Sequence, residues 1–244
     1  MKTVYFALSI LFFASCDILS EAVNTVNLSS NTEETPNPLT NEEVIGGLKE
    51  ALNVGIKNSV DLTSIADGFY KNAAIKLPFP EDAIKVKEKA LDLGLEGQVE
   101  KFELTLNRAA EEATKEAVPI FVDAIKNMTV SDGFAILNGG DGAATSYLKS
   151  STNDKLITAF SPVVENAISK VKLTDYWNPI INKYNGIMTL TGGEKLNPDL
   201  NAYITEKAID GLFYMVAIEE NKIRENPVAQ VTDLLKRVFG SLLN

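Results

Sequence analysis

The sequence predicts an all-α fold: one multi-helix globular domain over residues 40–244, with about eight to ten helices. From residue 40 onward, apolar side chains recur every three or four positions, which is the spacing of one helical face. No run of alternating β-branched residues, which would indicate strands, interrupts this pattern. Hydrophobic residues make up 45% and charged residues 23% of the 244, so the chain can fill a core and keep its surface hydrated.

The first residues indicate export from the cytoplasm. Lys2 precedes an apolar run over residues 4–14, which is shorter than the roughly 17–25 residues of a membrane-spanning helix. The segment Phe13-Ala14-Ser15-Cys16 resembles a bacterial lipobox, in which the cysteine is acylated and becomes the first residue after cleavage. We therefore predict a lipoprotein signal peptide over residues 1–15. A plain secretory signal with an incidental cysteine and a cytosolic protein with an apolar start are the alternatives.

Lipidation of Cys16 would attach the chain to the cell envelope, because two or three acyl chains hold a protein on a membrane where one does not. The following residues, to position 39, are rich in Asn, Ser, Thr and Glu and contain Pro36 and Pro38. Such a composition buries too little apolar surface to order itself, so we expect a flexible tether over residues 16–39. The pattern does not distinguish the inner from the outer membrane.

The first predicted helices begin at recognisable capping sequences. Thr40-Asn41-Glu42-Glu43 is a capping box with Leu39 as a hydrophobic staple, and it predicts a helix over residues 41–60. Pro80 and the two acids after it suit a first turn, and Gly94 suits an end, so residues 81–93 should be helical. We predict a longer helical segment from Gln98 to about Met128, broken near Val118 because Pro119 follows.

The remaining helices are predicted from caps, glycines and prolines. Thr129 should cap a short helix that ends at Asn138, and the glycine-rich turn after it should lead into a helix over residues 143–150. Four further helices are expected, over residues 153–171, 174–185, 199–225 and 228–241. The last of them carries a wide apolar stripe, which predicts docking on the core or on a partner.

Composition excludes several classes of function. The formal charge is −10, and loss of residues 1–15 would leave 22 basic and 33 acidic residues, so a nucleic-acid partner is not expected. The chain has no histidine and one cysteine, which removes Ser-His-Asp and Cys-His catalysis and the usual zinc ligands. We therefore expect no metal and no cofactor.

Two groups of residues are candidates for a site. Asn107, Arg108 and Glu111 share one helical face, and a kink at the following proline would bring Asp123 and Lys126 towards them in a polar cleft. The simpler interpretation is a salt-bridge network that locks the helices together. A carboxylate-only calcium or magnesium site is the less favoured alternative, since no loop has the alternating ligand pattern of such a site.

The second candidate is the turn before the helix that starts at residue 143. Gly140, Asp141 and Thr145 lie where backbone N–H groups at a helix start can bind an anion. The Asp141 carboxylate should occupy this N-cap itself, which favours a plain interhelical turn. Ser146 and Lys149 have the Ser-x-x-Lys spacing of penicillin-binding acyl-transfer enzymes, but no Lys-Thr-Gly motif and no sheet to carry one follows.

Several segments resemble the bacterial envelope lipoprotein family called domain of unknown function 4197. The resemblance spans nearly all of residues 45–240, and four segments carry it: 106–111, 120–129, 139–145, and 223–240 from Ile223-Arg224-Glu225-Asn226-Pro227 to Leu234-Leu235-Lys236-Arg237-Val238-Phe239-Gly240. It implies a single helical unit and a lipoprotein, and it carries no established activity or catalytic residues.

The leading hypothesis from the sequence is a lipid-anchored, non-enzymatic helical module that binds an envelope protein or an apolar ligand between its helices. An enzyme of hydrolase type that uses the carboxylates and arginine of the predicted cluster is the first alternative. A purely structural envelope protein is the second, and it predicts no specific ligand.

Overall fold

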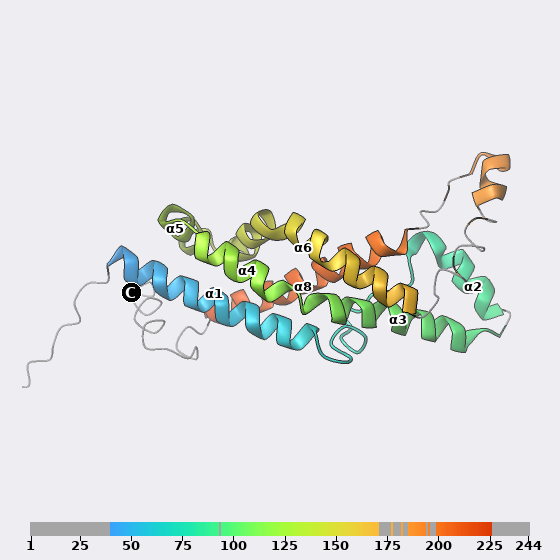
Figure 1. Cartoon of the computed structure of the whole chain (residues 1–244), viewed down its shortest axis with the longest axis horizontal. Helices are drawn as coiled ribbons and strands as arrows, with labels where there is room; N and C mark the ends of the chain where they lie inside the picture. Colours follow the sequence, from blue (N-terminus) through green and yellow to red (C-terminus); the bar gives the residue numbers. More distant parts are fainter. Residues whose placement is uncertain are drawn as a thin grey trace, which may run out of the picture. The chain divides into compact units, whose positions relative to one another are not determined.

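Every regular element in the described part of the chain is helical, as predicted (Figure 1). The computed structural model describes residues 40–92, 94–170, 177, 182, 185–193, 195 and 199–225. The predicted signal peptide, tether, staple residue Leu39 and last helix over residues 228–241 lie outside these ranges, as does most of the helix predicted over 174–185. No helix within them is both long and apolar enough to cross a membrane.

Helix α1 (Asn41–Thr63) begins at the predicted capping box. The Thr40 hydroxyl accepts a hydrogen bond from the N–H of Glu43 at 3.1 Å, and the Glu43 carboxylate accepts one from the N–H of Thr40 at 2.9 Å. The helix continues three residues beyond the predicted end at position 60. In this last turn the Thr63 hydroxyl donates to the carbonyl of Ser59 at 2.8 Å, so the polar side chain is satisfied inside the helix.

A loop over residues 64–80 leads to a 3-10 turn, η1 (Glu81–Ala83), and helix α2 (Ile84–Asp92). The prediction of a helix from residue 81 is confirmed, and its first turn is a 3-10 turn. The loop itself buries large side chains, since Phe69, Leu77 and Phe79 are at most 5% exposed. It is therefore part of the core, although its sequence has no helical period.

Helices α3 (Glu96–Thr114) and α4 (Ala117–Asn127) correct the predicted position of the break. The chain leaves the helix at Lys115 and Glu116, and Val118 and Pro119 lie in the first turn of α4. The first four N–H groups of a helix have no partner within it, so a proline there loses no hydrogen bond. Proline at this position is compatible with a new helix and does not mark the break itself.

Helices α5 (Val130–Asn138) and α6 (Ala143–Lys170) follow. The predicted cap of α5 is confirmed, because the Thr129 hydroxyl accepts from the N–H of Asp132 at 3.1 Å. The prediction of two helices, over 143–150 and 153–171, was wrong, since α6 runs through both. Its polar junction stays helical because the Ser151 and Thr152 hydroxyls donate to carbonyls one turn earlier, at 2.8 and 2.6 Å.

Helix α8 (Leu200–Glu225) confirms the helix predicted over 199–225 and lies at the centre of the packing. It contacts α1, α3 and α6, and α1 also contacts α4 and α5. Figure 1 shows α1, α6, α8 and the consecutive pair α3 and α4 running lengthwise beside one another. The described helices form a single compact domain, as predicted.

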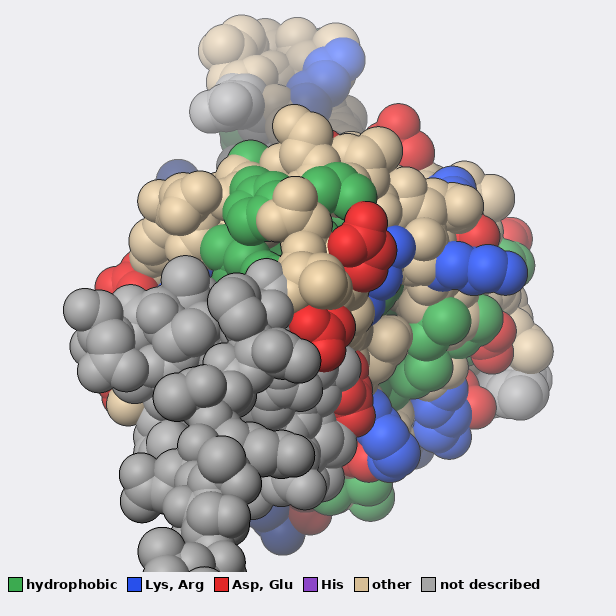
Figure 2. Space-filling view, turned by 90° about the vertical axis from the view of Figure 1, so that its left-hand side faces the viewer, with side chains coloured by type: hydrophobic (Ala, Val, Ile, Leu, Met, Phe, Trp, Pro, Cys, Tyr) green, Lys and Arg blue, Asp and Glu red, His purple; other side chains and the backbone are tan. Residues whose placement is uncertain are grey.

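Aromatic and aliphatic side chains fill the interior between these helices. Phe121 on α4 meets Phe213 on α8 edge to face, with ring centroids 5.6 Å apart, and Phe160 on α6 is fully buried. Burying each such side chain contributes about 1.5–3 kcal/mol. On the end face in Figure 2, acidic and basic side chains are interspersed around small apolar areas.

Candidate functional site

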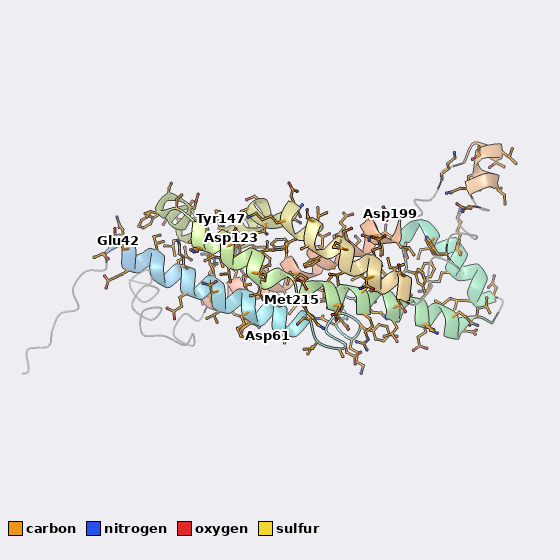
Figure 3. The ribbon with its side chains drawn as sticks, viewed as in Figure 1. Glu42, Asp61, Asp123, Tyr147, Asp199 and Met215 are labelled. Carbon is orange, nitrogen blue, oxygen red and sulfur yellow. The ribbon has the colours of Figure 1, made fainter. Side chains whose placement is uncertain are left out.

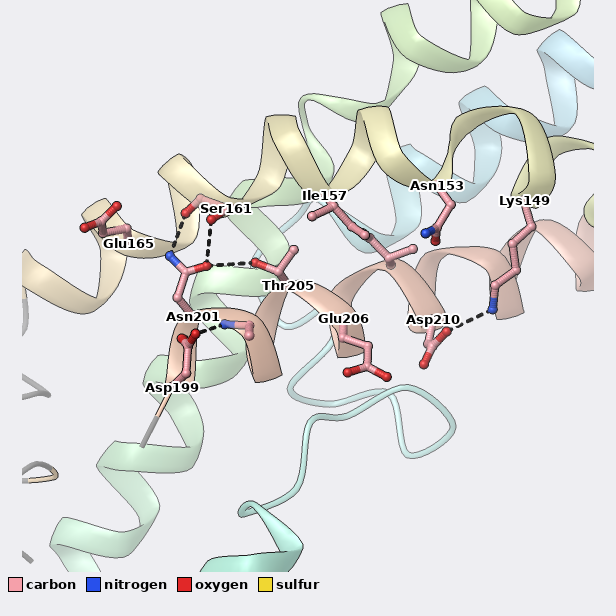
Figure 4. A pocket seen from close by; sticks show the side chains of 12 residues that line it. Lys149, Asn153, Ile157, Ser161, Glu165, Asp199, Asn201, Thr205, Glu206 and Asp210 are labelled. Atoms are coloured by element: carbon pink, nitrogen blue, oxygen red, sulfur yellow. Dashed lines mark hydrogen bonds and ion pairs between the residues drawn. The ribbon is translucent and has the colours of Figure 1, made fainter. Parts of the chain in front are cut away.

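An open groove of about 700 Å³ lies between α6 and α8 (Figure 4). One wall consists of α6 side chains four residues apart, which places them on one helical face: Lys149, Asn153, Ile157, Ser161 and Glu165. The other wall consists of the start of α8 and the residue before it: Asp199, Asn201, Ala202, Thr205, Glu206, Ile209 and Asp210.

A hydrogen-bonded cluster joins the two walls towards the Asp199 end of the groove (Figure 4). The Ser161 hydroxyl donates to the Asn201 amide oxygen at 2.9 Å, and the Asn201 amide nitrogen donates to the Ser161 carbonyl at 2.9 Å. The Thr205 hydroxyl also donates to the Asn201 amide oxygen, at 3.2 Å. These bonds fix the separation of α6 and α8 at this point, so the groove is preformed.

The rim of the groove is acidic, with four carboxylates against one ammonium group. Lys149 pairs with Asp210 across the groove at 3.1 Å, and both side chains are about half exposed. Asp199, at the start of α8 (Figure 3), accepts a hydrogen bond from the N–H of Ala202 at 3.0 Å. The described residues contain no group of three metal-ligating side chains that could hold a metal ion.

Three residues of the predicted polar cluster do come together, all on α3 and against the loop over residues 64–80. The Glu111 side chain is 4% exposed, and one of its oxygens accepts from the N–H groups of Phe69 and Tyr70 at 3.1 and 3.2 Å. Its other oxygen accepts from Arg108 at 2.6 Å, and Arg108 also donates to Asp67 at 2.7 Å. The network thus joins α3 to the loop through both backbone and side-chain groups.

Ion pairs shift the pKa values of Asp67 and Arg108. The hydrogen bond from Lys71, and then the one from Arg108, lower the pKa of Asp67. The hydrogen bond to Glu111 and then the one to Asp67 raise the pKa of Arg108 against the opposing effect of burial. Asp67 has a left-handed backbone conformation with φ of 70°, which is costly for most residues. Its two cationic partners stabilise this conformation.

Asn107 is fully buried and makes a two-point contact with the backbone of Leu77. Its amide oxygen accepts from the N–H of Leu77 at 2.8 Å, and its amide nitrogen donates to the carbonyl of Leu77 at 3.0 Å. The same nitrogen donates to the Glu103 carbonyl at 2.8 Å. Because one side chain satisfies both backbone groups of a buried loop residue, its role is structural.

Asp123 and Lys126 do not join this network. Asp123, on α4 (Figure 3), pairs with Lys155 of α6 at 2.9 Å, and the carbonyl of Lys126 accepts a hydrogen bond from Lys49 of α1 at 3.0 Å. The predicted cleft of five residues was therefore wrong. The break between α3 and α4 does not fold α4 back, so residues 15 positions apart remain about 20 Å apart along the axis.

The glycine-rich turn before α6 adopts the conformation that its glycines favour. Gly140 and Gly142 have φ of +71° and +76°, where a side chain would be strained. The expectation that Asp141 caps α6 was wrong, because a carboxylate from α8 takes this position. Glu220 accepts from the N–H of Ala144 at 3.0 Å.

Glu220 also accepts from the N–H and the hydroxyl of Thr145, at 2.9 and 2.7 Å. Arg224 then binds Glu220 through two nitrogens, at 3.0 and 2.8 Å, and donates to the Ile136 carbonyl at 3.0 Å. Burial would raise the pKa of Glu220, but the bonds from Thr145, Ala144 and Arg224 outweigh it and lower that pKa. The anion bound at the start of α6 is thus the protein's own carboxylate.

Sequence reasoning missed two features that position the site. Glu220 lies 75 residues from Thr145 and stands beside Glu219 on α8, so no pattern local to either segment indicates that Glu220 and Thr145 meet. Both acids are buried, at 4% and 6% exposure, and Glu219 accepts from Asn58 of α1 at 3.0 Å. The groove was missed as well, although four of the five residues at four-residue spacing along this face of α6 are polar, which was a usable signal.

The domain is thus a helical bundle whose polar networks are internal and whose groove is open and acidic. A family model described as "Protein of unknown function (DUF4197)" matches residues 38–240, so the chain belongs to this family. No curated protein and no solved structure matches the chain.

Proposed function

We propose that this is a lipid-anchored envelope protein whose helical domain binds a partner protein in the groove between α6 and α8 without catalysing a reaction. The groove itself carries the proposal. It is open, has a volume typical of ligand sites, and is held at a fixed width by Asn201. Most of the side chains that line the groove are charged or polar, which disfavours an apolar ligand there.

The anchor is supported by the lipobox resemblance at Cys16 and by the short apolar run before it. Mass spectrometry of the protein extracted from its own envelope tests this part. We expect acyl mass on Cys16 as the first residue, and a Cys16→Ser variant that leaves the membrane fraction. An unmodified cysteine in the mature protein would contradict the anchor.

Binding in the groove is tested by a photo-crosslinking amino acid at Asn153, compared with one at Glu112, an exposed residue of α3 outside the groove. In the intact envelope, we expect the groove position to give a discrete crosslinked species that the control position lacks. Equal labelling from both positions, or none from either, would refute a partner at this site.

The geometry does not support the alternative of an enzyme that uses carboxylates and an arginine. Glu111 and Arg108 are hydrogen-bonded to each other, and Glu111 also accepts from the backbone of the loop over residues 64–80. We expect Arg108→Ala to lower the free energy of unfolding by about 2–4 kcal/mol, since it leaves the buried Glu111 charge without its cation. Thermal unfolding measures this directly. A variant with unchanged stability would favour a functional arginine instead.

A further inference from the structure

The four carboxylates of the groove are spread along its length. On the α8 wall, Asp199 and Asp210 are 11 residues apart, which corresponds to about 16 Å along the helix. Glu206 lies between them, one turn from Asp210, and Glu165 lies at the far end of the α6 wall. The groove is therefore a linear acidic site and not a single point of charge.

Lys149 offsets part of this charge through its pair with Asp210. Glu165 and Glu206 are both exposed, and neither forms an ion pair with another residue in the described ranges. The acidic side chains therefore repel an anionic occupant and attract a cationic one.

The groove also has an apolar part between its charges. The Ile157 side chain on α6 is 44% exposed, and the exposed Ala202 and the buried Ile209 lie on the opposite wall. Lysine and arginine have apolar stems that pack on such surface while their charged ends stay in water. The polar groups of Ser161 and Asn201 are already bonded to each other, so they are not the main source of affinity.

The groove has room for a short extended segment. An extended chain needs about 160 Å³ per residue at sheet spacings, so the 700 Å³ of the groove fits four or five residues. Their extended length of about 15 Å matches the acidic span along α8.

We propose that the groove binds an extended segment of a partner protein with lysine or arginine at alternate positions. This inference rests on the proposed function and specifies the partner's chemistry. Alternate residues of an extended segment lie about 6.6 Å apart on one face, close to the one-turn separation of Glu206 and Asp210. Because these charges are exposed, binding should weaken steeply with salt.

The test uses the full-length, detergent-solubilised protein and a labelled five-residue peptide with lysine at positions 1, 3 and 5 and alanine between. Fluorescence anisotropy measures binding at low and at physiological salt. We expect the double variant Glu165→Gln, Glu206→Gln to weaken binding at least tenfold. The matched control, Glu112→Gln with Glu116→Gln, removes two exposed charges outside the groove, one at the end of α3 and one just before α4, and should change binding less than twofold.

Equal loss in the two double variants would show that only net charge attracts the peptide, and would overturn the proposal. Absence of peptide binding to the unmodified protein would also overturn it. Crosslinking from Asn153 in the Glu165→Gln, Glu206→Gln background separates this failure from failure of the proposed function. A crosslink that persists there refutes the cationic segment and keeps the partner site, and no crosslink in any background refutes both.

Discussion

Glu220→Gln removes the charge that α8 places at the start of α6, while the side chain keeps nearly the same size. The carboxylate accepts from two backbone N–H groups, one hydroxyl and the Arg224 guanidinium. Hydrogen bonds to a charged group contribute about 1.5–3 kcal/mol against about 0.5–1.5 for neutral ones. In the glutamine variant, the amide N–H₂ group also replaces one acceptor oxygen, so a donor faces the N–H and O–H donors that Glu220 accepts from. We expect a loss of about 3 kcal/mol, or roughly 6–12 °C in Tm.

The loss should depend on pH in a defined direction. The folded-state pKa of Glu220 is lowered from its ordinary 4.5, so the carboxylate contributes its full stabilisation above about pH 4.5. This contribution disappears as the pH falls through the lower folded-state pKa. The gap in unfolding free energy between wild type and Glu220→Gln should therefore shrink as the pH falls below 4.5.

Urea denaturation followed by the circular dichroism of the helices measures this gap at neutral and acid pH. Glu112→Gln is the control, because Glu112 pairs with Lys115 on the exposed surface and should contribute no more than about 0.5 kcal/mol. If Glu220→Gln costs no more than this control, or if its cost is the same at acid pH, the carboxylate does not stabilise α6 in the way described.

Two further substitutions test the packing. Asn107→Ala leaves both backbone groups of Leu77 buried and unpaired, and we expect it to cost about 2–4 kcal/mol in denaturant unfolding; a cost below about 1 kcal/mol would mean that water replaces the amide. Gly211→Ala adds a methyl 2.6 Å from the buried Phe69 ring, so overpacking of about 1–3 kcal/mol should exceed the helix-propensity gain of about 1 kcal/mol. Gly97→Ala on α3 is the control, because no atom lies within 4 Å of the added methyl, and it should raise Tm slightly. If the two variants are equally stable, the Phe69 ring moves aside without cost, and the overpacking argument is wrong.

Local signals in the sequence located most helices correctly. The capping boxes at Thr40 and Thr129 placed the starts of α1 and α5, because a cap needs only residues three positions apart. Local signals were less reliable inside helices. Prolines and polar runs suggested breaks that the structure places elsewhere or lacks, since a helix accepts proline in its first turn and satisfies hydroxyl groups within itself.

The candidate sites were predicted less well for a related reason. Asn107, Arg108 and Glu111 were identified as a group because they share a helical face, and α3 does hold them together. Their partners are backbone groups of the loop over residues 64–80, which no periodicity could have indicated. Asp123 was assigned to the same cluster only because a kink was assumed to fold α4 back.

The sequence by itself determined the helical class, the capped starts of α1 and α5, the acidic charge and the absence of histidine, because each depends on composition or on neighbours within one or two turns. Only the tertiary structure decided which helices meet and how each is rotated about its axis. That rotation places Glu220 at the start of α6 and turns the polar rows of α6 and α8 towards each other as a groove. Periodicity defines which face of a helix is apolar, but the partner of each polar residue depends on packing between distant segments.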